Sequence, residues 1–399
     1  MSEDVRIAVV GCGGISYAHL RGYENLQKAG LGGFRISAVC DVDEGRAMKF
    51  ADDVAKFQEG KAPECFADVE SLLKAGAADA VDICTSVAHH HQIALMGIEH
   101  GLHATMEKPF TITIKAGRKV VEAAEAKGVV CSVSENWRFM PAFQQAKWLI
   151  DDGRIGDFRS VMYGLSGRDH CFPNKVVGNT PWRHQKLIAG AGAIFDVSSH
   201  DFAVLRTLCN EIDRVSGATL VISDTKVMLD ESGAVLSEHP NNVDDVGFAL
   251  LYFRNGGMGM LAQGWGGHGV AGKVEGWMTI QGTEGSINSD SNSGTLFLDD
   301  KSSHDIETLF NENAPEEVRE SCFPKGITDS FALELHDWIQ AIRHTRRPVN
   351  HGSEGLRDIA VSYGVIESSL LRETVSIEDI LSGKVANYQK EIDDHWGLL

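Results

Sequence analysis

The sequence predicts a two-domain α/β protein, in which a parallel, doubly wound sheet is followed by a large, mostly antiparallel open sheet. Up to residue 135, short apolar stretches alternate with helix-like stretches, and that alternation is typical of a parallel sheet. Further along, strand-like stretches follow one another with turn residues between them, which indicates antiparallel pairing. The expected domains are residues 1–135 and residues 136–399.

The expected elements can be placed by residue number. In the first domain the strands fall at 5–10, 34–41, 80–87, 102–109 and 129–136, the helices at 17–29, 89–101 and 114–128, and a short strand and helix at 64–76. In the second domain a helix at 141–156 precedes strands at 158–167, 214–223, 246–253, 257–265 and 274–282. Two helices at 329–345 and 354–371 close the chain, and they are free to pack back on the first domain.

Composition and charge exclude several classes of protein. The apolar runs are far shorter than the roughly 20 residues of a membrane-spanning helix, and the acidic N-terminus does not look like a secretory signal. A formal net charge of −19 disfavours nucleic acid as a partner. The eight cysteines form no CxxC pair, which suits reduced thiols. We expect a cytoplasmic protein with neither a nucleic-acid nor a membrane partner.

A glycine cluster follows the first strand and precedes a helix. Gly11 permits a tight turn, and Gly13 lets the backbone approach a pyrophosphate at the helix N-terminus. Gly14 follows, and Ser16 is small enough for close packing of helix on strand. The cluster alone is also compatible with an ordinary turn between a strand and a helix. In an alternating strand–helix context, it indicates a dinucleotide-binding Rossmann domain.

Asp41 ends the second strand, where an acidic residue can hydrogen-bond the adenosine ribose. Asp43 and Glu44 lie nearby and no arginine follows immediately, so a 2′-phosphate should be repelled. The sequence therefore favours NAD over NADP. The alternative is that Asp41 only caps the next helix.

Glu107, Lys108 and Pro109 lie where another strand ends. Ligands of parallel sheets bind off the carboxyl ends of the strands, so the charged pair should lie at the cofactor edge. Pro109 biases Lys108 toward an extended conformation and so fixes how its side chain leaves the strand.

Taken together, these motifs resemble the glucose–fructose oxidoreductase/inositol dehydrogenase family (Gfo/Idh/MocA). The resemblance rests on Gly11–Ile15 with His19, Asp41, Thr85 with His90, Glu107–Pro109, and the stretches at 136–139, 182–183, 190–201, 280–287 and 354–356. Two departures are Ser86-Val87, where the family has Pro-Asn, and Ala203, where it often has aspartate. The resemblance implies NAD(P)-dependent redox chemistry on sugars or polyols. The cofactor-binding residues that we expect are Gly11, Gly13, Gly14, Ile15, Asp41, Thr85, His90, Glu107 and Lys108.

The stretch 190–208 carries the candidate acid–base pair. If it is helical, Asp196 and His200 stand at i and i+4 on one face, where the carboxylate would orient the imidazole and raise its pKa. An ordinary surface pair is the alternative reading of this spacing. By resemblance, Lys108 hydrogen-bonds the reacting hydroxyl, His200 accepts its proton and Asp196 lines the substrate site. Spacing leaves open whether Lys108 or His200 is the final acceptor, since a buried lysine can also serve.

Further polar residues suit a polyol pocket. The candidates are Asn136, Arg138, His170, Trp182, Arg183 and His184, together with His200. Core packing is the alternative for Trp182 and a structural ion pair for Arg138, while Arg183 could bind the carboxylate of a sugar acid. Neighbouring residues on a helix point in different directions, so the histidines at 89–91 do not indicate a metal site, and we expect no metal.

The favoured interpretation is an NAD-dependent sugar or polyol dehydrogenase that assembles as a homodimer or homotetramer through its open sheet. A redox-neutral glycoside-cleaving enzyme that uses NAD is the first alternative. A non-catalytic sensor of sugar or NAD is the second, and the presence of Lys108, Asp196 and His200 argues against it.

Overall fold

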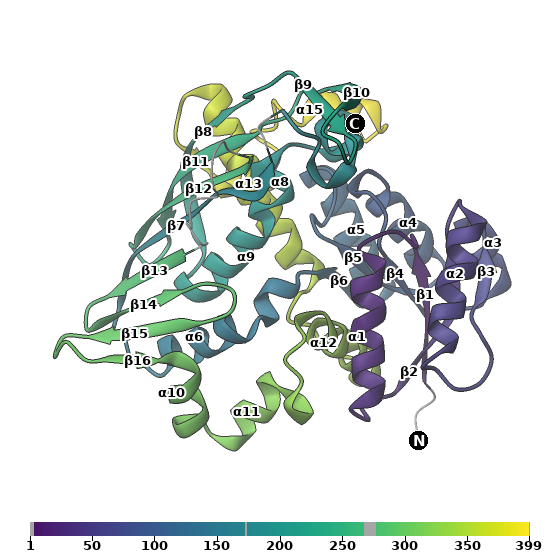
Figure 1. Cartoon of the computed structure of the whole chain (residues 1–399), viewed down its shortest axis with the longest axis horizontal. Coiled ribbons are helices and arrows are strands. Elements are labelled where there is room, and N and C mark those ends of the chain that lie inside the picture. Colours follow the sequence, from purple (N-terminus) through teal and green to yellow (C-terminus); the bar gives the residue numbers. More distant parts are fainter. Residues whose placement is uncertain (1–3, 172–173, 267–276, 399) are drawn as a thin grey trace. The chain divides into compact units, whose positions relative to one another are not determined.

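The computed structural model describes residues 4–171, 174–266 and 277–398, and it divides into two compact units (Figure 1). Unit 1 comprises Met1–Phe139 and Glu320–Leu356. Unit 2 comprises Met140–Arg319 and Arg357–Leu399. Residues Glu320–Leu356 thus belong to unit 1, although they follow most of unit 2 along the chain.

Unit 1 is built on a six-stranded sheet in the order β3-β2-β1-β4-β5-β6, and every neighbouring pair is parallel. The strands are β1 Val5–Val10, β2 Phe34–Cys40, β3 Glu64–Phe66, β4 Ala80–Ile83, β5 His103–Glu107 and β6 Cys131–Ser134. This order, with strands added outward from a central pair, is that of a Rossmann fold. The predicted parallel, doubly wound sheet is confirmed.

Local capping signals set the ends of the connecting helices. Asp43, Asp68 and Thr113 are N-caps whose side chains accept a backbone N–H, while Gly76 and Gly128 end their helices in the left-handed conformation. The helices are α1 Ser16–Lys28, α2 Glu44–Ala55, α3 Val69–Ala75, α4 Val87–Glu99 and α5 Ile114–Lys127, and the 3-10 helix η1 Asn136–Phe139 follows β6.

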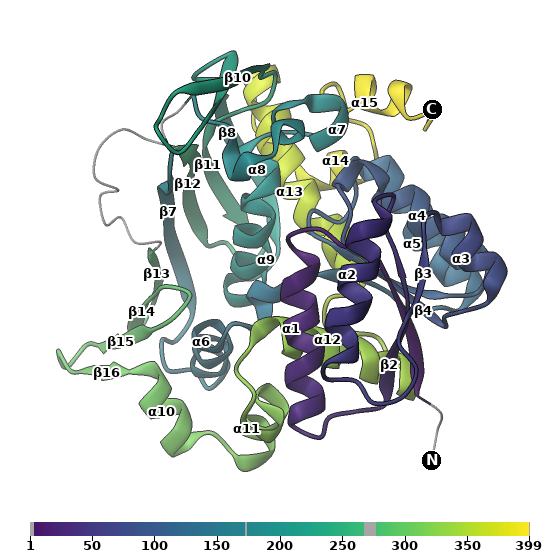
Figure 2. The ribbon, with the colours of Figure 1, turned by 45° about the vertical axis from the view of Figure 1, so that its right-hand side comes forward.

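Helix α12 (Ser330–His344) completes the core of unit 1 and lies beside α1 (Figure 2). Its buried face, with Leu335 and Trp338, packs with Tyr23 of α1 and Ile7 of β1 in one hydrophobic cluster. Gly22 of α1 makes the close approach possible, because a Cβ there would lie 3.1 Å from the backbone nitrogen of α12's Ala332.

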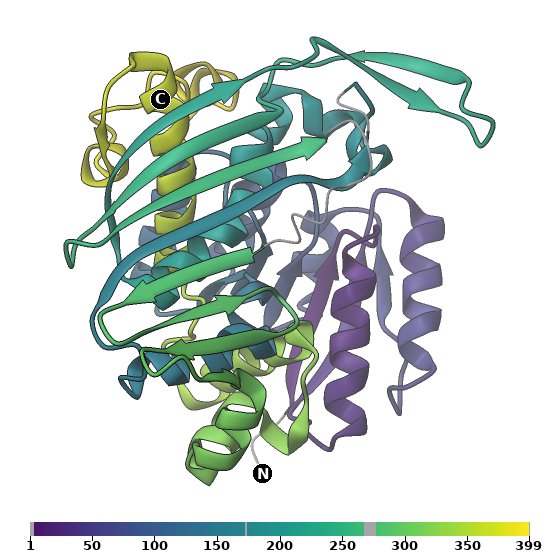
Figure 3. The ribbon, with the colours of Figure 1, turned by 60° about the vertical axis from the view of Figure 1, so that its left-hand side comes forward.

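Unit 2 contains a nine-stranded sheet in the order β16-β15-β14-β13-β7-β12-β11-β8-β17 (Figure 3). The strands are β7 Phe158–Cys171, β8 Ile212–Leu220, β11 Val246–Phe253, β12 Met258–Gly266, β13 Trp277–Gly282, β14 Gly285–Ser289, β15 Gly294–Leu298, β16 Ser303–Asp305 and β17 Val375–Ser376. Only β7 and β12 pair in parallel among them. The large, mostly antiparallel sheet that the sequence predicts is confirmed.

The two faces of this sheet differ. One face packs against helices; for example, a Cβ at Gly217 would lie 2.6 Å from Val365 of α13. The other face presents Met162, Phe248, Leu250 and Met260, all exposed. No helix from the described part of unit 2 lies over these strands in Figure 3. The remaining helices of this unit are α6 Pro141–Asp151, α7 Lys186–Ala189, α8 Ala193–Asp196, α9 Ser198–Cys209, α10 Ile306–Asn313, α14 Ile377–Leu381 and α15 Lys390–His395, with η2 Val177–Asn179 and η3 Pro181–His184. Two further helices, α11 Glu316–Cys322 and α13 Gly352–Leu371, each run across a boundary between the units, and η4 Pro324–Gly326 lies in unit 1.

A two-stranded hairpin, β9 Thr225–Leu229 and β10 Val235–Pro240, projects from one end of the sheet (Figure 3). The sequence analysis did not anticipate it. Its first strand also holds the loop before η2, because the N–H of Val176 donates to the carbonyl of Val227 at 3.0 Å.

Among the described helices, none has both the length and the hydropathy that crossing a bilayer would require.

Asp329 should be the cap on which unit 1 depends most. Its carboxylate accepts from the N–H groups of Phe331 and Ala332 and also from Arg21 and Asn25 of α1. Asp329→Ala should therefore lower the free energy of unfolding by about 1–2 kcal/mol, the upper part of the range for a lost N-cap. Urea unfolding followed by circular dichroism measures it. Asp68→Ala, which removes only the local cap of α3, is the control, and an equal shift in both variants would contradict the assignment.

Candidate active site

The glycine loop after β1 has the geometry of a phosphate cradle. Gly11 has φ 92°, and a Cβ there would lie 2.9 Å from the backbone carbon and oxygen of Cys84. Around Gly13 and Gly14, in contrast, a Cβ would meet no heavy atom within 4 Å. Helix α1 begins without a side-chain cap and without an acidic residue in its first turn. The residues present therefore fit the pyrophosphate of a dinucleotide.

Asp41 lies directly after β2 and joins two loops. One carboxylate oxygen accepts from the N–H of Cys12 at 2.8 Å, and the other accepts from the N–H of Asp43 at 2.9 Å. The N-cap of α2 is Asp43 and not Asp41, which removes the alternative that Asp41 serves as that cap. Its contact with the ribose stays a prediction.

His90 connects the loop after β4 with the turn after β5. Its Nε2 lies 3.0 Å from the carbonyl oxygen of Thr85, and its Nδ1 lies 3.2 Å from that of Pro109. The ring is buried, and burial lowers its pKa. A neutral imidazole carries a single N–H, so His90 lies against both carbonyls and donates to one of them. A contact with the cofactor stays a prediction for His90, for Thr85 and for Ile15.

Glu107 and Lys108 lie at the carboxyl end of β5. Glu107 is buried, with its Oε1 3.0 Å from Nε2 of His19 in α1. Lys108 is half-buried, and its peptide bond to Pro109 is cis. The pair thus lies at the same sheet edge as the glycine loop and Asp41, as the order of the strands requires.

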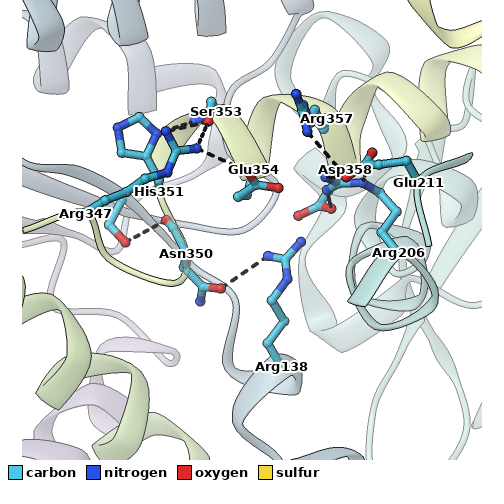
Figure 4. A network of polar contacts seen from close by, with 11 residues as sticks. Arg138, Arg206, Glu211, Arg347, Asn350, His351, Ser353, Glu354, Arg357 and Asp358 are labelled. Carbon is cyan, nitrogen blue, oxygen red and sulfur yellow. Dashed lines mark hydrogen bonds and ion pairs between the residues drawn. The ribbon is translucent and has the colours of Figure 1, made fainter. Parts of the chain in front are cut away.

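Two predicted substrate residues are held inside unit 1. The amide nitrogen of Asn136 donates to Ser330 at 3.0 Å. Arg138 is buried and donates to the side-chain oxygen of Asn350 at 3.2 Å (Figure 4). These contacts tie η1 to the C-terminal part of the unit, and the substrate roles of both residues stay predictions.

The stretch around Asp196 forms two helices where one was predicted. Helix α8 ends at Asp196, α9 begins at Ser198, and Val197 lies between them. Both Asp196 and His200 are half-buried. Within α9, Arg206 pairs with Asp358 of α13 and with Glu211, which fixes α9 in unit 2 (Figure 4).

Asp196 receives a hydrogen bond from Arg183, whose Nε lies 3.1 Å from the Asp196 Oδ2. The guanidinium also donates to Thr180, and it lies over the ring of Trp182 at 4.5 Å. These residues form one polar cluster in unit 2. The Asp196 carboxylate is therefore already paired with a cation, and the Arg183 guanidinium is already paired with an anion.

His184 is buried and structural in character, because its Nε2 accepts the N–H of Val177 at 3.1 Å. Burial lowers its pKa to about 4. The side chain of His170 lies outside the described residues.

Asp244 is a residue that the sequence analysis missed. Its two carboxylate oxygens accept from the N–H groups of Gly192 and Ile194, at 2.8 and 2.9 Å, and its carbonyl accepts from Ala193 at 3.0 Å. Burial raises its pKa to about 6. Asp244 thus fixes the start of α8 from a distant loop, and it sets where Asp196 lies. A neighbouring Asp-Asp pair in the sequence was the only signal.

The three consecutive histidines separate as the helix geometry requires. His89 is exposed, whereas His90 and His91 are buried. Among the described residues, the metal-ligand types that gather within 4.8 Å are instead His19, Asp82 and Cys84, which hydrogen-bond to one another.

The glycine loop allows a matched pair of variants. Gly13→Ala places a methyl group in open space where the pyrophosphate should lie, so it should weaken NAD binding at least about tenfold, as an extra methyl in a tight pocket can, without changing thermal stability. Gly11→Ala should instead destabilise the fold, because of its positive φ and the contact with Cys84. Calorimetric titration with NAD and thermal unfolding measure both. Unchanged NAD affinity in Gly13→Ala would refute the cradle.

Known proteins resemble this chain in sequence and in fold. D-apiose dehydrogenase of Paraburkholderia graminis is 27% identical over 246 residues, 60% of this chain and 58% of that protein. The scyllo-inositol 2-dehydrogenase (NAD(+)) of Bacillus subtilis is 27% identical over 363 residues, 88% of this chain and 89% of that protein. A solved structure of levoglucosan dehydrogenase with NADH and L-sorbose superposes with a TM-score of 0.81 at 21% identity, covering 95% of this chain and 100% of that one.

Family models cover most of the chain. Residues 5–135 match the model described as "Oxidoreductase family, NAD-binding Rossmann fold". Residues 143–288 match the "GFO/IDH/MocA C-terminal domain". The chain therefore belongs to the GFO/IDH/MocA family of NAD-binding oxidoreductases.

Proposed function

We propose that this protein oxidises a secondary alcohol of a sugar or polyol with NAD, and that its reaction centre is the carboxyl edge of the unit 1 sheet. The observation that carries the proposal is that the glycine loop, Asp41 and Lys108 follow β1, β2 and β5 of one parallel sheet. A cofactor cradle and a charged group suited to a hydroxyl thus share one edge. The division into a cofactor domain, 1–135, and a substrate domain, 136–399, is part of the proposal, with Glu320–Leu356 of the second packed back within unit 1.

NAD would supply the hydride acceptor at C4 of its nicotinamide. The chain supplies the rest. Gly13 and Gly14 leave space for the pyrophosphate, Asp41 binds the ribose hydroxyls, and Lys108 donates a hydrogen bond to the reacting hydroxyl. His200, assisted by Asp196, accepts the proton in one version of the proposal, and Lys108 accepts it in the other.

A neutral substrate rich in hydroxyl groups suits the polar cluster of unit 2 better than a sugar acid. Arg183 already donates to Asp196, so its guanidinium does not offer an uncompensated charge to a carboxylate. The ring of Trp182 provides a flat surface next to the hydrogen-bonding side chains of Arg183 and Asp196. Carbohydrate pockets use this combination. The related dehydrogenases of apiose and scyllo-inositol support the same class.

The proposal includes a homodimer or homotetramer in the cytoplasm. Exposed apolar side chains on β7, β11 and β12 support association through the open face of the sheet. Seven cysteines are free, which suits a reducing compartment; they are Cys12, Cys40, Cys65, Cys84, Cys131, Cys209 and Cys322.

The test of the function is NADH formation, followed by absorbance, with a panel of sugars, inositols and sugar acids and with NAD and NADP in parallel. We expect a signal with neutral sugars or polyols and with NAD. Sugar cleavage without net NADH would point to the redox-neutral glycosidase. Binding of NAD with no turnover of any kind would point to a sensor.

Lys108→Met should lower kcat by about 10²–10⁴-fold, because it removes the group that polarises the hydroxyl or accepts its proton. The affinity for NAD should change little, since the cradle and Asp41 remain. The control is Lys28→Met, an exposed lysine paired with Glu24 at the end of α1, which should behave as the unmodified protein. Near-normal kcat in Lys108→Met would refute the catalytic assignment.

Phe248→Asp should convert the assembly to a smaller species, because it places a charge on the exposed apolar face. Light scattering after size-exclusion chromatography measures the mass. Val42→Asp, at a 92% exposed position of unit 1, is the control. An unmodified protein that is already monomeric would contradict the proposed interface.

A further inference from the structure

His19 is a fully buried histidine that lies between two carboxylates from neighbouring strands. Its Nδ1 is 2.9 Å from Oδ2 of Asp82 in β4, and its Nε2 is 3.0 Å from Oε1 of Glu107 at the end of β5. Helix α1 supplies the ring, directly after the glycine loop. One side chain thus joins α1 to both strands whose carboxyl ends form the proposed reaction edge.

The contacts at both ring nitrogens require two protons. A neutral imidazole carries a single N–H and can donate to only one of the two carboxylates. Burial alone would lower the pKa of His19, but the charge of Asp82 and its hydrogen bond raise that pKa well above the usual range. The ring is therefore an imidazolium at neutral pH, and it donates one charge-assisted hydrogen bond to each carboxylate.

Asp82 is itself held in place. It accepts a second hydrogen bond from the hydroxyl of Tyr23 at 2.9 Å and a weaker contact from the thiol of Cys84 at 3.6 Å. All of these side chains are buried. Asp82 therefore acts as a fixed anchor for His19, and the ring cannot follow Glu107 if Glu107 moves.

Two side chains of α12 lie near His19, and neither adds a negative charge beside Asp82 and Glu107. The ring of Phe331 packs against that of His19, with 5.7 Å between the centroids. Glu334 is buried on this helix as well, and burial raises its pKa well above the usual value. Its carboxyl group is thus neutral, and it adds no third negative charge beside Asp82 and Glu107.

Glu107 immediately precedes Lys108 along the chain. His19 can therefore act on Lys108 through Glu107, without itself contacting the substrate or the cofactor. We propose that His19 is a positioning residue, which holds the Glu107 carboxylate and thereby fixes the end of β5 from which Lys108 projects. This inference rests on the proposed function of Lys108. The ring of His90 lies against the Pro109 carbonyl at 3.2 Å, so side chains of α1 and α4 contact the segment on both sides of Lys108.

The alternative is that His19 only stabilises the fold. The two roles differ in what they change. A positioning role acts through Glu107 and alters kcat and the local opening of β5, whereas a stabilising role lowers the melting temperature and leaves kcat per folded molecule unchanged.

A double-mutant cycle of His19→Gln and Glu107→Gln separates them, with kcat and NAD affinity measured at a temperature where every variant is folded. His19→Gln should lower kcat by about 10–100-fold, as a misplaced catalytic group does, while changing NAD affinity little. The double variant should cost no more than the worse single variant, because two changes on one pathway are not additive. The matched control His100→Gln, at the exposed end of α4, should leave kcat unchanged.

Hydrogen exchange of the peptide spanning β5 and the following turn, residues 103–113, gives a readout that needs no substrate. His19→Gln should speed exchange there about tenfold or more relative to His100→Gln, because the end of β5 opens more often. Multiplicative losses of kcat in the double variant, or unchanged exchange at 103–113, would overturn the proposal. If no sugar is oxidised at all, the proposed function fails, and the exchange rates still decide whether His19 holds β5.

Discussion

The candidate site depends on the close approach of the glycine loop to the end of β4. Gly11 lies so near the carbonyl of Cys84 that no side chain fits between them, and its own N–H donates to the carbonyl of Cys40 at the end of β2. From this contact a series of bonds continues along the sheet edge. Cys12 donates to Asp41, and the His90 ring lies between the carbonyls of Thr85 and Pro109. The ends of four strands are thus held in one arrangement before any ligand is present.

In unit 2 the corresponding constraint is the set of hydrogen bonds that Asp244 accepts from backbone N–H groups. A Cβ at Gly192 would lie 1.8 Å from the Asp244 carbonyl, so this approach also depends on glycine. The result is that Asp196 stands at the end of a short helix whose start is fixed from another loop. Arg183 then sets the direction of its carboxylate. Both units therefore place the candidate site residues on backbone that is fixed by polar contacts, as preorganised sites require.

The sequence predicted what local patterns determine. Alternation of strands and helices predicted the parallel sheet, consecutive strands predicted the antiparallel one, and the glycines after β1 predicted the cradle-shaped turn. It did not predict how the start of α8 is held, because the capping group is Asp244, far away in the sequence. Likewise, His19 and Glu107 are far apart along the chain, and no local periodicity reveals that they meet. The β9–β10 hairpin was missed because its strands are short and largely exposed.

The central claim is net hydride transfer from a carbohydrate carbon to NAD. The most direct measurement uses a perdeuterated form of the substrate that the panel identifies, followed by mass spectrometry of the nicotinamide product. We expect reduced cofactor that is heavier by one deuterium and that accumulates in step with the oxidised sugar. Cleaved sugar together with NAD of unchanged mass and amount would contradict it.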